Sequence, residues 1–192
     1  MTSWYPEDIP VPDSLRTAEF LIRPLRATDV ILDYDAVISS RAELWLRSGG
    51  QWPREGFTLE ENLADLKFHE QEHQERIAFT YTVMNVTETE CLGCIYINPL
   101  RKMLERAGGS LEQLAGIGEH EAWVTFWVRQ NHLVDQLDAR LLQALMAWFK
   151  TEWSFTRVVF AARKEQERQI RLFEEVGMSL WYTLPRSCVY EL

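Results

Sequence analysis

The stretch HEAWVTFWVRQNHLVDQLDARLLQALMAWF, residues 120–149, decides the fold. Residues 122–129 are rich in β-branched and aromatic side chains and predict a buried strand. From about residue 136 to residue 151, apolar side chains recur at helical spacing and predict an amphipathic helix: Leu137, Leu141, Ala144, Leu145 and Trp148. The turn between strand and helix carries no glycine. A helix N-terminus leaves backbone N–H groups unpaired, so this turn is a candidate anion site.

Outward from this unit, the chain alternates between strand-like and helix-like segments. Strands are predicted at 20–24, 77–86, 91–98, 157–161, 179–184 and 187–190, and helices at 29–47, 59–74 and 165–176. Thr58 and Glu61 predict a capping box before the second helix. Residues 1–19 hold three prolines and predict an N-terminal arm. Residues 20–192 then form one domain with an irregular or partly helical insertion at about 99–120.

Composition narrows the class of protein. A chain of 192 residues fits a single domain, and 20 basic against 29 acidic residues give a net charge of −9. Such a charge repels phosphate backbones and suits cationic or neutral small substrates, so no nucleic-acid partner is expected. No apolar run approaches the roughly 20 residues that span a bilayer, so no membrane association is expected. The acidic, proline-rich N-terminus and three cysteines predict a cytoplasmic protein without a disulfide framework.

Four segments resemble one known family. They are RPLRATDV (23–30), LGCIYINPL (92–100), FWVRQNHLVDQLDARLL (126–142) and RLFEEVGM (171–178). Together with the element order, they resemble the GNAT superfamily of acyl-CoA-dependent N-acetyltransferases. The resemblance implies an α/β fold, a single domain with a mixed, mostly antiparallel sheet flanked by helices. It also implies an enzyme that transfers an acetyl group from acetyl-CoA to an amine of a small molecule or peptide.

The resemblance carries the cofactor contacts onto nine positions: Trp127, Val128, Arg129, Leu133, Val134, Gln136, Asp138, Gln166 and Phe173. The first three would offer backbone groups to the pantetheine arm. Leu133 stands at the arginine of the family's turn, and Val134, Gln136 and Asp138 stand at its three glycines. Gln166 stands at the asparagine before the last long helix, and Phe173 at the tyrosine that protonates the leaving thiolate.

The turn departs from the family pattern in a way that affects anion binding. Asp135 occupies the expected N-cap position, and Asp138 follows three residues later, as in a capping box. These carboxylates would satisfy the amides that otherwise bind pyrophosphate. At close range they would also repel it, at a cost of about 1 kcal/mol or more. Weak acetyl-CoA binding is therefore expected.

Other site residues are predicted from position and residue type. The family's general base lies near the start of the central strand, where Glu121 is the nearest candidate; a solvated strand entrance is the alternative. Trp45 and Trp52 could form the wall of an acceptor pocket, or belong to the core.

Two short motifs suggest metal or redox chemistry. HEQEH (69–73) matches the zinc-protease pattern, but its flanks are charged and no third ligand is apparent, so a polar helix end is the alternative. CLGC (91–94) lies inside a strand, where residues three apart point to opposite faces. Core cysteines and no metal site are therefore expected.

Three hypotheses about function remain. The first is an acetyl-CoA-dependent N-acetyltransferase with a non-standard phosphate turn that acts on a small-molecule amine. A homodimer is a possible assembly of this enzyme. The second is a GNAT-fold protein without that activity, serving as a small-molecule-binding or interaction module. The third is a metal hydrolase that uses the HEQEH motif.

Overall fold

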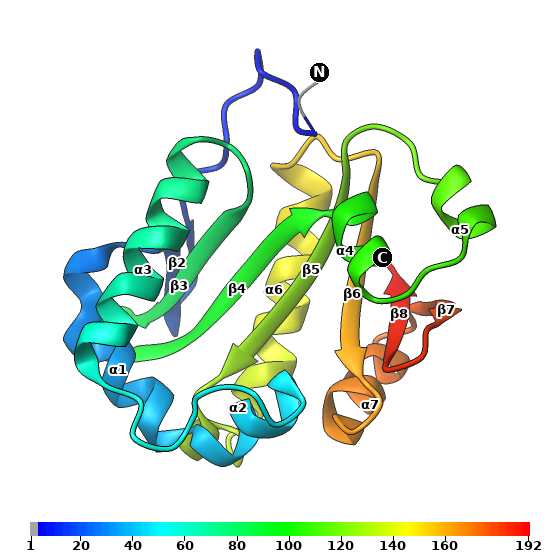
Figure 1. Ribbon diagram of the computed structural model, residues 1–192. Coiled ribbons are helices and arrows are strands. Elements are labelled where there is room, and N and C mark those ends of the chain that lie inside the picture. The colour runs from blue at the N-terminus through cyan, green and yellow to red at the C-terminus, as the bar shows by residue number, and fades with distance from the viewer. Residues whose placement is uncertain (1–3) are drawn as a thin grey trace. The chain divides into compact units, whose positions relative to one another are not determined.

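A computed structural model describes residues 4–192 and has an α/β architecture (Figure 1). Among these residues, eight strands form one mixed sheet in the order β1-β2-β3-β4-β5-β6-β8-β7. The chain divides into two compact parts: a first part, residues 13–96 and 126–141, and a second part, residues 4–12, 97–125 and 142–192. None of the described helices is long and apolar enough to cross a membrane.

The strands of the first part begin with an antiparallel ladder. β1 (Leu15–Arg16) pairs with β2 (Phe20–Pro24), and β2 pairs with β3 (Phe79–Asn85) from Phe20↔Asn85 to Pro24↔Tyr81. β4 (Cys91–Pro99) follows β3 after a tight turn. The strand predicted at 20–24 is confirmed, and the two strands predicted after it are confirmed within two residues at each end.

Four helical segments of the first part precede β3: η1 (Ala27–Asp29), α1 (Val30–Ser39), α2 (Arg41–Ser48) and α3 (Leu59–Gln74). Figure 1 shows α1 and α3 side by side, and α3 also contacts β3. The predicted capping box is confirmed, since Thr58 Oγ1 accepts from Glu61 N–H and Glu61 Oε2 accepts from Thr58 N–H. Buried apolar side chains from these helices and from the strands form one hydrophobic core cluster: Leu25, Ala36, Val37, Leu44, Leu66, Met84, Cys91, Cys94 and Trp127.

The single helix predicted over 29–47 is wrong, because the chain breaks at Ser40 into α1 and α2. Ser40 has φ −110° and ψ 15°, and it is fully buried. Its hydroxyl accepts a hydrogen bond from Gln130 N–H at 3.0 Å, ninety residues along the chain. A contact of this kind fixes the break, and helical periodicity cannot reveal it.

The second part contains the later strands and three of the helices. β5 (Glu121–Val128) pairs in parallel with β6 (Arg157–Arg163) from Glu121↔Arg157 to Val124↔Phe160, and β5 continues beyond the last of these pairs. β8 (Ser187–Glu191) pairs antiparallel with both β6 and β7 (Ser179–Thr183). The region predicted as an insertion holds α4 (Leu100–Arg106) and α5 (Leu111–Ala115), and α7 (Glu167–Glu175) lies between β6 and β7. Three elements have residues in both parts: β4, β5, whose residues 126–128 belong to the first part, and the long helix α6 (Leu137–Thr151).

Gly93 interrupts the regular alternation of β4. Its φ is +154°, far from the values of an ordinary strand residue, and a Cβ atom built on it would lie 2.0 Å from the Trp127 carbonyl oxygen. The prediction that Cys91 and Cys94 point to opposite faces is wrong for this reason. Both thiols approach the same carboxylate, that of Asp33.

Replacing Gly93 by alanine tests this constraint. Because the added methyl meets backbone and not a movable side chain, we expect the free energy of unfolding to fall by about 3 kcal/mol or more. Denaturant titration of the purified variant measures the change. Gly116→Ala is the matched control, because Gly116 has φ −80° and its nearest neighbour would lie 3.5 Å from the new methyl. Equal stability of the two variants would contradict the expectation.

Candidate cofactor and acceptor site

The end of β5 has two backbone edges with different surroundings. Arg129 N–H donates to the Leu92 carbonyl at 2.7 Å, and the Trp127 carbonyl lies against Gly93. Because backbone groups alternate along a strand, those of Phe126 and Val128 point to the opposite edge. Three residues are predicted to offer backbone groups to pantetheine: Trp127, Val128 and Arg129. Of these, only Val128 has its backbone groups on the edge that points away from β4. The Arg129 N–H is already bonded within the sheet.

The turn after β5 keeps a glycine-like backbone without glycine. After η2 (Gln130–His132), Gln136 adopts φ +57°, the left-handed conformation that glycine adopts without strain. Gln136 stands at one of the three glycine positions. Among residues 4–192, the N–H groups of Val134 and Asp135 have no hydrogen-bond partner, and the Val134 side chain is 82% exposed. The turn therefore presents two backbone donors to solvent.

The structure corrects the predicted N-cap. α6 begins at Leu137, so the residue that precedes the helix is Gln136 and not Asp135. Asp135 is exposed, and its backbone carbonyl accepts a hydrogen bond from the Arg140 guanidinium. Asp138 lies in the first turn of α6, where only 2% of its surface is exposed and its negative charge is favoured by the helix dipole.

Each basic side chain between residues 126 and 141 contacts a carboxylate. Arg129 Nη2 lies 2.6 Å from Asp35 Oδ2, and Arg129 Nη1 lies 3.4 Å from Glu90 Oε1. His132 lies 3.2 Å from Glu90, and Arg140 lies 2.6 Å from Glu19. The positive charges that could attract a pyrophosphate are thus compensated by this chain's own acids. An anion at this turn would therefore have to be bound by backbone N–H groups.

A surface pocket of about 490 Å³ lies beside α2. Arg41, Ala42 and Trp45 of α2 line it together with Glu55 from the following loop. Its size is in the range of small-ligand sites. Trp45 is 42% exposed there, whereas Trp52 packs edge-on against Phe57 at 5.6 Å between ring centroids, at the border of the core. The structure thus places only Trp45 of the two predicted tryptophans in this pocket.

Sequence reasoning missed a polar group at the end of β5. Arg47 Nη1 donates to the Phe126 carbonyl at 3.3 Å, on the edge that points away from β4. The Arg47 guanidinium also lies 5.4 Å from the ring centre of Tyr96, whose hydroxyl accepts from Trp127 Nε1 at 3.4 Å. Burial lowers the pKa of Arg47 and raises that of Tyr96 well above its usual value. No sequence motif marks Arg47, and no motif indicates that Arg47, Tyr96 and Trp127 meet, because they come from three separate elements.

Three further predicted site residues belong to the second part. Glu121 Oε1 accepts from Arg157 at 2.9 Å, while the buried Oε2 has no partner among the described residues. Gln166 precedes α7, and its side chain accepts from Arg163 N–H at 3.0 Å. Phe173 is 1% exposed, and its ring packs against Phe160 and Tyr190. The catalytic and cofactor roles of these residues stay predictions.

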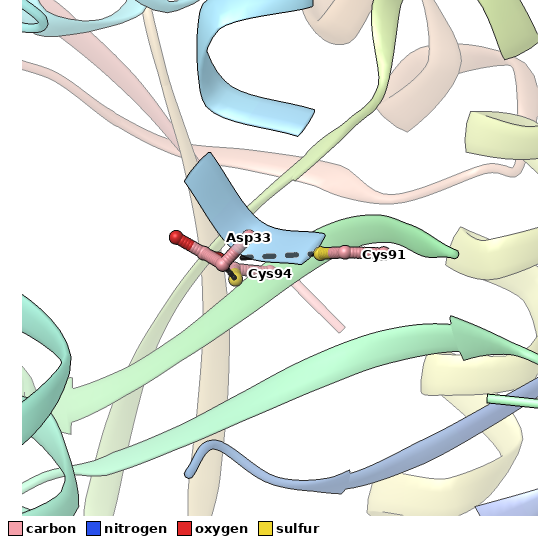
Figure 2. Close-up of side chains that lie close together, drawn as sticks. All are labelled: Asp33, Cys91 and Cys94. Carbon is pink, nitrogen blue, oxygen red and sulfur yellow. Dashed lines mark hydrogen bonds between the residues drawn. The ribbon is translucent and has the colours of Figure 1, made fainter. Parts of the chain in front are cut away.

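The two histidines of HEQEH both turn toward Thr80 of β3. His73 Nδ1 lies 3.1 Å from the Thr80 carbonyl, and His69 Nδ1 lies 3.4 Å from the Thr80 hydroxyl. Burial lowers the pKa of His73. Within residues 4–192, the group whose ligand atoms converge is a different one: Asp33, Cys91 and Cys94 (Figure 2).

The backbone at Gln136 generates a prediction on stability. A non-glycine residue in the left-handed region carries a strain of about 1–2 kcal/mol, which glycine relieves. Part of this gain in stability is offset, because glycine also gives the unfolded chain more conformational freedom. We therefore expect Gln136→Gly to raise the free energy of unfolding by about 0.5 kcal/mol or more. Gln143→Gly in the exposed middle of α6 is the matched control and should lose about 1 kcal/mol. Thermal or denaturant unfolding would refute the left-handed conformation if both variants lost stability equally.

Similar solved structures share this fold. RimL, a ribosomal L7/L12 alpha-N-protein acetyltransferase, is 16% identical with a TM-score of 0.68, over 96% of this chain and 98% of its own. The microcin C7 self-immunity acetyltransferase MccE, in complex with acetyl-CoA and AMP, is 11% identical with a TM-score of 0.70, over 95% and 97%. A ribosomal-protein-S5-alanine acetyltransferase from Vibrio fischeri is 14% identical with a TM-score of 0.65, over 94% and 95%.

Sequence comparison gives the family itself. No curated protein sequence matches the chain. The model of the acetyltransferase (GNAT) family matches residues 40–178, which include α2, the end of β5, the turn and α6. This match confirms the predicted fold class, and together with the structural neighbours it indicates an acyltransferase. The chain belongs to the GNAT acetyltransferase family.

Proposed function

We propose that this protein transfers an acetyl group from acetyl-CoA to a primary amine. The observation that carries the proposal is the turn at 133–136, which keeps a left-handed residue and two unpaired backbone donors although it has no glycine. The backbone can thus supply the anion contacts that the family's glycines supply. Acetyl-CoA would bring the activated thioester, and the chain would bind and orient it.

The residues of the first part fit this cofactor in their backbone geometry. The N–H groups of Val134 and Asp135 would hold the pyrophosphate, because backbone donors next to a helix N-terminus favour anions. The backbone groups of Val128 would orient the pantetheine arm. Arg47 would hold the Phe126 carbonyl in place and put a positive charge beside this edge of β5.

Charge opposes the same fit. Asp135 is exposed next to both donors, and Glu90, Asp35 and Glu19 already compensate the basic side chains of the turn. A pyrophosphate must then bind against local negative charge. This observation favours weak acetyl-CoA binding, and it also supports the second candidate function, a GNAT-fold module that binds another small molecule.

Removing the Asp135 charge should strengthen cofactor binding. In calorimetric titration with acetyl-CoA, we expect Asp135→Asn to bind roughly two- to fivefold more tightly than the unchanged protein, because an exposed repulsion is relieved. Glu60→Gln, an exposed residue in the first turn of α3, is the matched control for net charge and should bind as the unchanged protein does. Absence of any acetyl-CoA binding in all three proteins would favour the second candidate function.

The pocket beside α2 suits the amine acceptor. Glu55 offers a carboxylate and Trp45 an aromatic face, both of which attract an ammonium group, although Arg41 on the same wall limits a dicationic ligand. Two of the similar structures are acetyltransferases of ribosomal proteins, which supports a peptide amine beside the small-molecule amine predicted from sequence. Glu121, in the second part of the chain, is kept as the general base proposed from sequence.

Neutralising Glu55 should weaken acceptor binding with little effect on chemistry. We expect Glu55→Gln to raise KM for a peptide or small primary amine roughly two- to fivefold with kcat unchanged, because an exposed charge pair contributes modestly. Steady-state release of free CoA measures both constants, and Glu60→Gln again controls for net charge. An unchanged KM would place the acceptor outside this pocket.

A further inference from the structure

A buried carboxylate meets two buried thiols at the junction of α1 and β4. Asp33 is 3% exposed, and Cys91 and Cys94 are 0% and 1% exposed. Figure 2 shows the Asp33 side chain reaching from α1 toward both sulfur atoms of β4. We propose that Asp33, Cys91 and Cys94 form a binding site for a divalent, thiophilic metal ion of the zinc type.

The first argument is charge. Among residues 4–192, no basic side chain contacts Asp33, whose other carboxylate oxygen accepts only from Asn62 Nδ2 at 2.9 Å. Buried carboxylates are expensive to keep ionised unless they are paired with a cation or bound to a metal. A cation at the point where the carboxylate and the thiols converge supplies the missing partner.

The second argument is geometry. Asp33 Oδ1 lies 3.6 Å from Cys94 Sγ and 4.0 Å from Cys91 Sγ, and all three ligand atoms lie within 4.8 Å of one another. In tetrahedral zinc sites, bonds of roughly 2.0 Å to oxygen and 2.3 Å to sulfur place neighbouring ligand atoms about 3.5–3.8 Å apart. The two distances from Asp33 Oδ1 to the sulfur atoms are thus close to those of a bound site. Thiolates select soft metals such as zinc over magnesium or calcium.

The third argument is the surrounding shell. The Asn62 amide holds the carboxylate, and the Thr82 hydroxyl lies 3.8 Å from Cys94 Sγ; ligands held in this way keep their orientation. Asn62 is fully buried, and its Oδ1 has no partner in the described part of the chain, so a residue that contacts Asp33 carries an unpaired buried oxygen. Gly93 fixes the backbone that directs both cysteines to one side.

The binding step balances as a proton exchange. The ion displaces one proton from each thiol and bonds to two thiolates and to the carboxylate, with no change of oxidation state. Because every ligand is buried, the ion enters as the first part folds. Binding energy then adds to the free energy of folding.

Metal analysis of the full-length protein tests the site. The untagged protein is folded with zinc and dialysed against a weak chelator. Inductively coupled plasma mass spectrometry should then find about one zinc ion per chain. Refolding with cobalt(II) should produce thiolate charge-transfer absorption and the intense visible bands of a tetrahedral site. Cys94→Ser and Asp33→Asn should lose the metal, whereas Cys188→Ser, which removes the remaining cysteine outside the cluster, should retain it.

Several outcomes would overturn the proposal. The cobalt spectrum of the unchanged protein needs no variant to fold, so a reduced, folded protein that shows no thiolate charge transfer rejects the site. Retention of zinc by folded Cys94→Ser rejects it as well. A mass lower by two hydrogens in Cys188→Ser, which keeps only Cys91 and Cys94, would show a disulfide between them and would also reject it. Acetyl-CoA titration does not enter this test, so its result is independent of the proposed acetyl transfer.

Discussion

The close approach of Gly93 to the Trp127 carbonyl is the constraint on which the first part of the structure depends. Backbone meets backbone where any side chain on Gly93 would collide, so the register between β4 and the end of β5 is fixed. The hydrogen bond from Arg129 N–H to the Leu92 carbonyl lies next to this contact. It determines which backbone groups of β5 point toward β4 and which point to the other edge.

The same contact has a second consequence on β4. Cys91 and Cys94, which a regular strand would direct to opposite faces, converge on Asp33. One glycine thus shapes two regions: the β5 edge proposed for pantetheine and the buried cluster proposed for a metal. Both rest on a backbone conformation that glycine alone adopts without strain.

The turn after β5 shows conformation and charge in conflict. Gln136 keeps the left-handed backbone of a glycine position, and two N–H groups face solvent. Arg129, His132 and Arg140, however, are each held by an acid. The turn keeps the backbone conformation of one glycine position, whereas its charges would oppose a bound pyrophosphate. Shape and charge have therefore to be judged separately when a GNAT turn lacks glycine.

Much of the secondary structure follows from the sequence because its causes are local. Thr58 and Glu61 cap α3 through atoms three residues apart, and the apolar face of α6 repeats at helical spacing. Such patterns, with four family-like segments, predicted the fold class, which the family match confirms, and the turn that precedes α6. The prediction that Trp45 and Trp52 share one pocket depends on tertiary contacts: Trp45 lines the pocket beside α2, whereas Trp52 packs against the core.

Tertiary structure alone decided the features that depend on residues far apart in the chain. The helix ends at Ser40, where the hydroxyl accepts a hydrogen bond from Gln130 N–H. The side chains of β4 depart from regular alternation at Gly93, where the Trp127 carbonyl lies against the backbone. Arg47, Tyr96 and Trp127 form one group only because α2, β4 and β5 meet. Sequence periodicity records which face of an element is buried, because burial selects residue type. It does not record which distant atom meets that face, and those contacts place the polar groups of the site.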